Sequence, residues 1–204
     1  MATLLEIERT HPNPRLLEEA VRLFDDGAVV AYPTDTIYGL GCDFRNRQAV
    51  ERVYRIRELD RHRPLAFLFP DLADIARYAQ VSNTAYRIMR RIFPGPYTVE
   101  LEATREIPKV VMARRKRIGI RVPDEPVLRA ILTGLGRPIM STSAKTPEDE
   151  FLLTAFDIER TYGDKIDCII DSGPVPGLPS TVLSLVGDAV QVIRAGAGSL
   201  EGLE

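Results

Sequence analysis

The sequence predicts one α/β domain built on a twisted, mixed sheet with flanking helices. Strand-like and helix-like segments alternate through the first part of the chain, an order typical of helices packed on a partly parallel sheet. Near the end, two short apolar segments flank Gly187 and Asp188, which predicts a hairpin and adds antiparallel pairing. The chain has 204 residues, 45% of them hydrophobic, enough to bury one core. No internal repeat divides residues 1–204, so we expect a single domain with its core at about residues 16–200.

The first element is a predicted helix over residues 13–27. Its apolar residues recur with helical spacing, Asn13 is a suitable N-cap, and Pro14 suits the first turn. Gly27 is a typical helix stop.

The segment from residue 29 to residue 43 joins a predicted strand directly to a polar, glycine-containing stretch. Residues 29–31 suit a buried strand, and Pro33 marks the point where the chain leaves the sheet. Two interpretations of the polar stretch remain open: a loop that binds a polar ligand, or an Asx- or Ser/Thr-type turn that caps the next helix. The residues concerned are Thr34, Asp35, Thr36, Gly39 and Gly41.

The remaining elements are indicated by the periodicity of apolar residues and by Gly and Pro residues, which interrupt helices and strands. Helices are expected over residues 46–57, 71–78, 83–93, 125–135 and 153–162. Strands are expected over residues 65–69, 97–101, 117–122, 138–141, 166–170, 182–185 and 189–194.

Charge is distributed unevenly along a chain whose net charge is only -2. Residues 45–63 contain seven arginines and three acids, and residues 105–121 contain seven Lys or Arg and one acid. Residues 148–204 are acidic by contrast. The basic clusters suit a polyanion such as RNA, although many of these arginines could equally lie on solvated helix faces.

Several common classes of protein are disfavoured. Cys42 and Cys168 stand far apart and form no metal-binding motif, and neither histidine has the neighbours that a catalytic triad or a metal centre needs. We expect no metal site and two reduced thiols. There is no Walker or Rossmann glycine motif and no nucleophile elbow. The chain has neither a long apolar run nor a signal-like start, so a cytoplasmic location is expected.

Polar residues stand at the ends of several predicted strands. Arg121 lies in an otherwise apolar strand, where it needs either a protein carboxylate or an anionic ligand, and we favour the ligand. Hydroxyl groups and a further arginine occupy similar places, where they suit phosphate binding or helix capping. They are Thr98, Ser141, Thr142, Ser143, Ser180, Thr181 and Arg194.

Together these segments resemble the YrdC/YciO family of threonylcarbamoyl-adenylate synthase-like proteins over nearly the whole chain. The motifs are Y-P-T-D-T-I-Y-G-L-G (32–41), F-P-G-P-Y-T (93–98), I-G-I-R-V-P (118–123), S-T-S-A (141–144), P-S-T (179–181) and R-A-G (194–196). The resemblance implies a sheet around a large basic cavity. It also implies synthesis of threonylcarbamoyl-AMP and pyrophosphate from L-threonine, bicarbonate and ATP, with Mg²⁺, for tRNA modification.

The resemblance also implies roles for particular residues. Thr34, Arg121 and Thr181 would contact the threonine, with Arg121 holding its carboxylate. The nucleotide would be bound by Arg57, Ser141, Ser143, Ser180 and Arg194. Double-stranded RNA or tRNA would bind a basic patch of Arg61, Arg63, Arg114, Arg115, Lys116 and Arg117. The chain is expected to be a monomer or a homodimer.

The sequence departs from the synthases at three positions that bear on activity. By alignment, Leu59 replaces the arginine of a Lys-x-Arg pair whose lysine is Arg57 here, and Lys145 replaces an asparagine. Leu68 replaces a histidine. The pattern resembles the YciO branch. It leaves open an RNA- or nucleotide-binding protein with weak or no synthase activity, and, with less support, a hydrolase of a modified nucleotide.

Overall fold

The computed structural model describes residues 1–60, 65–108 and 116–203. The strands are β1 (Thr3–Glu6), β2 (Val30–Tyr32), β3 (Gly39–Cys42), β4 (Ala66–Leu68), β5 (Tyr97–Glu102), β6 (Arg117–Arg121), β7 (Ile139–Ser143), β8 (Cys168–Asp171), β9 (Thr181–Ser184) and β10 (Gln191–Arg194). They form one ten-stranded sheet in the order β1-β8-β2-β3-β7-β4-β6-β5-β9-β10. Parallel and antiparallel neighbours both occur, so the predicted mixed α/β sheet is confirmed.

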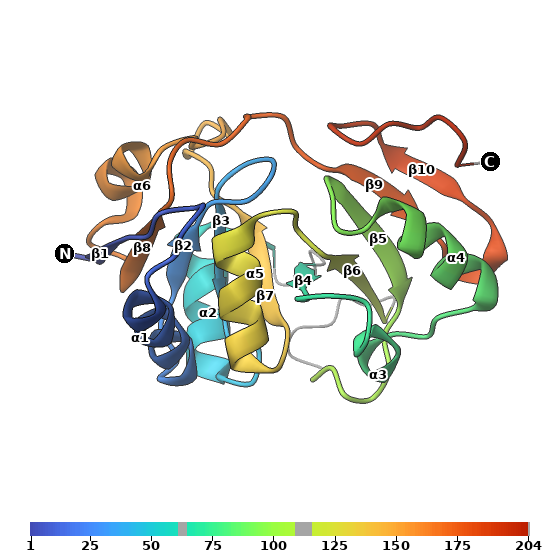
Figure 1. Cartoon of the computed structure of the whole chain (residues 1–204), viewed down its shortest axis with the longest axis horizontal. Coiled ribbons are helices and arrows are strands. Elements are labelled where there is room, and N and C mark those ends of the chain that lie inside the picture. Colours follow the sequence, from blue (N-terminus) through green and yellow to red (C-terminus); the bar gives the residue numbers. More distant parts are fainter. Residues whose placement is uncertain (61–64, 109–115, 204) are drawn as a thin grey trace.

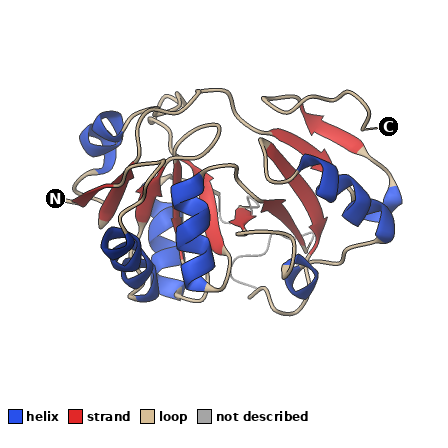
Figure 2. Cartoon of the chain, viewed as in Figure 1, coloured by secondary structure: helices blue, strands red, loops and turns tan. Residues whose placement is uncertain are grey.

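Helices cover both faces of this sheet (Figures 1 and 2). They are α1 (Pro14–Asp25), α2 (Arg47–Ile56), α3 (Ile75–Tyr78), α4 (Asn83–Ile92), α5 (Pro126–Leu135) and α6 (Ala155–Tyr162). Helices α1 and α5 lie side by side and bury one apolar cluster against β1, β8 and β2. Helices α2, α3, α4 and α6 contribute to the second cluster, which includes the opposite face of the sheet.

Helix starts agree with the capping signals of the sequence. The Asn13 side chain accepts a hydrogen bond from the Arg15 backbone N–H at 3.0 Å, and Pro14 occupies the first turn of α1. Asn46 accepts one from Ala49 at 3.0 Å at the start of α2. These bonds satisfy backbone donors that a helix leaves unpaired at its N-terminus.

Three predicted elements need correction. Gly39 and Gly41 were expected in a loop, but they lie in β3, which pairs antiparallel with β2. The helix expected over residues 71–78 is reduced to the single turn α3. Strand β1 was not predicted, although it pairs parallel with β8 and buries Leu5, so the core begins before residue 16.

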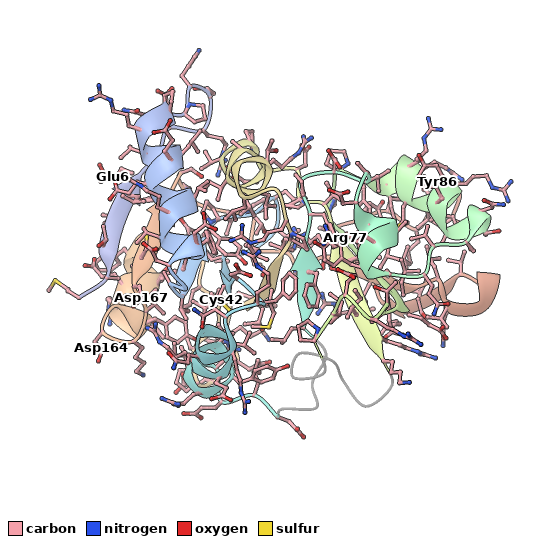
Figure 3. The ribbon with its side chains drawn as sticks, turned by 90° about the horizontal axis from the view of Figure 1, so that it is seen from below. Glu6, Cys42, Arg77, Tyr86, Asp164 and Asp167 are labelled. Carbon is pink, nitrogen blue, oxygen red and sulfur yellow. The ribbon has the colours of Figure 1, made fainter. Side chains whose placement is uncertain are left out.

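The molecule is elongated along the sheet, with β1 and α4 towards opposite ends (Figure 1). Glu6 of β1 and Tyr86 of α4, labelled in Figure 3, mark these ends. Cys42 and Cys168 are both buried and unpaired, and burial raises the pKa of the Cys168 thiol to about 12. Burial also raises the pKa of the Cys42 thiol, and a raised thiol pKa lowers the share of the nucleophilic thiolate form.

Candidate functional site

A cavity of about 220 Å³ lies where strands from both halves of the sheet meet. Most of the residues predicted to bind substrate line it together, although they come from distant parts of the chain. They are Thr34, Arg121, Ser141, Ser143, Ser180 and Arg194. Further lining residues include Tyr38, Leu68, Thr98, Glu100 and Gly119.

Strand register explains why the cavity lies on this face. Across neighbouring strands, Gly41 pairs with Ser141, Ser141 with Ala66, Ala66 with Gly119, and Gly119 with Glu100. Cross-strand partners point to the same face, so this row places small side chains next to one another. The alternate residues of β6, Ile118 and Ile120, are buried in the apolar cluster of the opposite face. Small residues on one face and large ones on the other leave space for the cavity.

The loop after β2 is held by the hydroxyl of Thr34. Its Oγ1 donates to the Ile37 carbonyl at 2.6 Å and accepts from the backbone N–H groups of Thr36 and Ile37 at 3.1 and 3.2 Å. This is a Ser/Thr-type turn, but it leads into strand β3 and caps no helix. Thr34 lines the cavity, and its only hydroxyl hydrogen is already committed to the protein.

Arg121 reaches this loop from the end of β6. It is 7% exposed, and its Nη2 donates to Asp35 Oδ1, to Thr36 Oγ1 at 2.8 Å and to Thr34 Oγ1 at 3.3 Å. The sequence analysis favoured a ligand over a carboxylate as the partner of Arg121, but the structure supplies a protein carboxylate, Asp35. Arg121 nevertheless lines the cavity, so a ligand can also contact it.

Tyr32 orients Ser141 and was not predicted as a site residue. Its hydroxyl donates to Ser141 Oγ at 2.7 Å, and burial raises the tyrosine pKa. The ring crosses the backbone of β3, because a Cβ atom on Gly39 would lie 2.5 Å from Tyr32 Cε2 and one on Gly41 2.4 Å from its hydroxyl oxygen. The two glycines therefore make room for Tyr32, and the spacing Y-x₆-G-x-G alone carries no signal of this contact.

The opposite wall comes from β5, β9 and β10. Thr98 Oγ1 and Ser180 Oγ lie 2.9 Å apart, and Arg194 Nη2 donates to the Ser180 carbonyl at 2.8 Å. Glu100, which we did not predict, accepts from Arg117 at 2.9 Å. Side chains alternate between the two faces of a strand, so Thr98 and Glu100 share a face, and this spacing could have indicated Glu100.

Two predicted binding residues lie outside the cavity lining. Thr181 is fully buried, and its hydroxyl donates to the Gly198 carbonyl at 2.7 Å. Arg57 donates to the carbonyl oxygens of Ser143 and Lys145 at 3.0 and 3.1 Å. Arg57 thereby holds the backbone at Ser143, which lines the cavity, and Thr181 holds the backbone at Gly198.

The structure describes the surroundings of all three residues that depart from the synthase pattern, Leu59, Leu68 and Lys145. Leu59 packs against the apolar core, and Leu68 is a buried residue of the cavity lining. Lys145 Nζ pairs with Asp149 at 2.8 Å and lies 4.4 Å from the centre of the Phe151 ring. None of the three brings a charge into the cavity.

The electrostatic expectations are met only in part. Among the residues that the structure describes, the charged ones in the cavity lining are Arg121, Arg194 and Glu100. The cavity volume lies below the ~300–1,000 Å³ typical of ligand pockets. The large basic cavity therefore stays a prediction. Of the proposed RNA patch, Arg61, Arg63, Arg114 and Arg115 lie outside the described residues, Lys116 is exposed, and Arg117 pairs with Glu100.

Neither a metal cluster nor a membrane-spanning helix occurs among the described residues. Within residues 1–60, 65–108 and 116–203, no three His, Cys, Asp or Glu side chains are arranged to hold a metal ion. In the same ranges, no helix is both long and apolar enough to cross a membrane.

Comparison with known proteins identifies the same family that the sequence motifs resemble. Residues 22–196 match the Sua5/YciO/YrdC family model, described as telomere recombination. The uncharacterized protein YciO of Escherichia coli is 36% identical over 98% of both chains, and its crystal structure has a TM-score of 0.94 to this one. The threonylcarbamoyl-AMP synthase of Mus musculus is 32% identical over 88% of this chain and 66% of its own.

A further solved structure shares the fold. It is P. abyssi Sua5 complexed with L-threonine, which is 24% identical, with a TM-score of 0.90 over 96% of this chain and 58% of that one. The family match covers far more than half of the sequence. The chain therefore belongs to the Sua5/YciO/YrdC family.

Proposed function

We propose that this protein is a nucleotidyltransferase that converts L-threonine, bicarbonate and ATP into threonylcarbamoyl-AMP, pyrophosphate and water, for threonylcarbamoyladenosine modification of tRNA. The observation that carries the proposal is the convergence of Arg121, Arg194 and the serine hydroxyls on one cavity. The mouse relative, named threonylcarbamoyl-AMP synthase, supports it at 32% identity.

The cavity offers two chemically distinct ends. At one end Arg121 is a buried cation suited to a carboxylate, which planar guanidinium groups bind well. At the other, Ser180, Thr98 and Arg194 offer hydroxyl and guanidinium groups suited to phosphate oxygens. Fixed donors of this kind stabilise the charge that develops on an α-phosphate during transfer. Mg²⁺ bound to ATP would add positive charge to the phosphates.

The test is pyrophosphate release from ATP, measured with and without L-threonine and bicarbonate. The wild type should release pyrophosphate only when both are present. Arg194→Ala should lower kcat/KM about 10²-fold, a loss typical of removing one charge-stabilising donor. Arg160→Ala is the matched control, since Arg160 lies over the exposed Phe156 ring on α6 and not at the cavity. Release that does not depend on threonine would refute the synthase.

A second function is favoured by the environments of Leu59 and Lys145. Each replaces a polar group of the synthases, and each is engaged elsewhere in the protein. We therefore also consider a binding protein that recognises RNA or a nucleotide without efficient turnover. RNA binding that weakens steeply between low and moderate salt, in the absence of threonine-dependent turnover, would support this function. Lys116→Glu should then reduce the affinity and the salt dependence together.

A further inference from the structure

A second cavity, of about 510 Å³, lies between α3, α4 and the end of β6, and we call it the α3–α4 cavity. Among the described residues, it shares no lining residue with the cavity that Arg121 and Arg194 line. Val122, which directly follows Arg121, lines the α3–α4 cavity and belongs to the apolar cluster of the opposite face of the sheet. The volume lies within the ~300–1,000 Å³ typical of ligand pockets.

The lining of the α3–α4 cavity is mostly apolar. Its buried residues include Ile75 of α3, Met89 of α4, and Phe93 and Val122. Tyr86 of α4 also lines it, although this side chain is 47% exposed and is seen at the surface in Figure 3. Ligand pockets are typically lined by apolar and aromatic side chains with few polar groups. The lining therefore suits the apolar body of a small molecule.

The charged residues that the structure describes in this lining are Arg129 and Asp71. Arg129, on α5, is partly buried, and its side chain makes one hydrogen bond, from Nε to the Pro70 carbonyl oxygen at 3.3 Å. No carboxylate pairs with Arg129 within residues 1–60, 65–108 and 116–203. Asp71 is exposed, and its Oδ1 accepts from the Ala73 backbone N–H at 2.7 Å.

Burial makes the two charges unequal in what they need. A partly buried cation in apolar surroundings is stabilised by an anion, whereas the exposed Asp71 carboxylate is solvated by water. The Nη groups of Arg129 remain available, and guanidinium groups bind carboxylates and phosphates well. A phosphate monoester carries nearly two negative charges, so Asp71 would repel it more strongly than a singly charged carboxylate.

We propose that the α3–α4 cavity binds a small molecule that has a ring-containing apolar body and one carboxylate group. Arg129 donates to the carboxylate from its Nη atoms, and the apolar body lies against Met89, Phe93 and Val122. The proposal concerns a site separate from the first cavity and does not depend on the synthase reaction.

The test uses two fluorescent probes that share one apolar body. They are 8-anilinonaphthalene-1-sulfonate, which carries one negative charge, and N-phenyl-1-naphthylamine, which carries none. Folded wild type should bind the sulfonate about tenfold more tightly, because hydrogen bonds to charged groups contribute roughly that factor. Arg129→Gln should abolish the preference, and Arg129→Lys should keep part of it. Ala76→Trp, which places a large side chain in the lining, should weaken binding of both probes.

Arg22→Gln is the matched control for the loss of one positive charge. Arg22 is exposed on α1, which lies in the other half of the molecule (Figure 1), so its replacement should change neither affinity. Thermal unfolding checks that every variant is folded.

Competition with the sulfonate probe then identifies the class of ligand. Indole-3-acetate should displace the probe from wild type, and indole-3-acetamide, which lacks the charge, should do so about tenfold less well. Equal displacement by the two would overturn the assignment of a carboxylate.

Three results with the probes would also overturn the inference. If neither Arg129→Gln nor Ala76→Trp changes the affinity, the probes bind elsewhere. If Arg129→Gln weakens both probes equally, Arg129 only shapes the cavity. If the neutral probe binds as tightly as the sulfonate in wild type, the cavity is suited to an apolar segment of another protein and not to an anion.

Discussion

The hydroxyl of Tyr32 donates a 2.7 Å hydrogen bond to Oγ of Ser141, across the intervening strand β3. A fully buried residue of β2 thereby sets the orientation of a hydroxyl in the cavity lining. Loss of this bond leaves a buried serine oxygen without its donor.

Tyr32→Phe should therefore lower the free energy of unfolding by about 1 kcal/mol, the typical net value of one hydrogen bond. The same change should weaken nucleotide binding at the cavity. Urea denaturation and nucleotide titration measure the two effects. Tyr86→Phe, on the exposed face of α4 (Figure 3), is the control and should change neither.

Gly41→Ala should destabilise the protein by about 1–3 kcal/mol, the usual cost of overpacking. The new Cβ atom would lie 2.3 Å from the Met140 carbonyl oxygen and 2.4 Å from the Tyr32 hydroxyl oxygen. The Tyr32 ring or the β3–β7 pairing must shift to relieve this clash. Chemical denaturation of the variant measures the cost, and an unchanged stability would show that β3 tolerates a side chain here.

Asp43 should make the stability depend on pH. Burial alone would raise its pKa, but hydrogen bonds from Arg45 and Arg137 outweigh burial and lower the pKa below its usual value. A carboxyl whose pKa falls on folding stabilises the native state above the unfolded pKa of about 3.9, and this contribution disappears as the pH drops through the native value.

Asp43→Asn should therefore cost about 3 kcal/mol at pH 7, because it leaves the largely buried Arg137 without one carboxylate partner. The difference from wild type should shrink below about pH 4. Urea denaturation across this pH range tests the prediction. Asp74→Asn is the control, since its exposed side chain makes no capping bond. If the stability difference between wild type and Asp43→Asn stays constant with pH, the negative charge of Asp43 is not its cause.

The combined change Leu59→Arg and Lys145→Asn restores the residues expected in the synthases. It should raise synthase turnover about tenfold or more, because one charge-assisted contact contributes roughly 1.5–3 kcal/mol. The single variants should gain less. Leu59 packs against the core, so thermal unfolding must accompany the assay. No gain in a folded double variant would contradict the alignment at these positions.

The sequence predicted most elements because their local signals agree with their packing. The helix from Pro14 has a cap, a proline and an apolar face, and all of these act within the segment itself. Strand β1 carried no such signal, since it is stabilised by pairing with β8 from far along the chain. The glycines of β3 indicated a loop. In the structure they leave room for the Tyr32 ring, which lies against them only because β2 pairs with β3.

The residues of the candidate site were likewise predictable only where the signal lies within a local motif. Motifs near the predicted strand ends identified the residues that converge, but Ser141 lies within β7 and Thr98 within β5, so these residues meet on one face of the sheet and not at an edge. The motifs could not distinguish Ser180, which faces the cavity, from its neighbour Thr181, which is buried. Nor could they identify Asp35 as the partner of Arg121, a contact that depends on how the turn after β2 closes.

The register of β5 with β9 has a consequence for biosynthesis. Ser180 and Arg194 reach the cavity only because β9 adds to β5, although the Thr34 turn on the other wall is made much earlier. On the ribosome, a chain that still lacks residues 180–194 has the side of the cavity formed by Thr34 and Arg121 without the side formed by Ser180 and Arg194. The cavity is therefore complete only after residues 180–194 have been translated and β9 has added to β5.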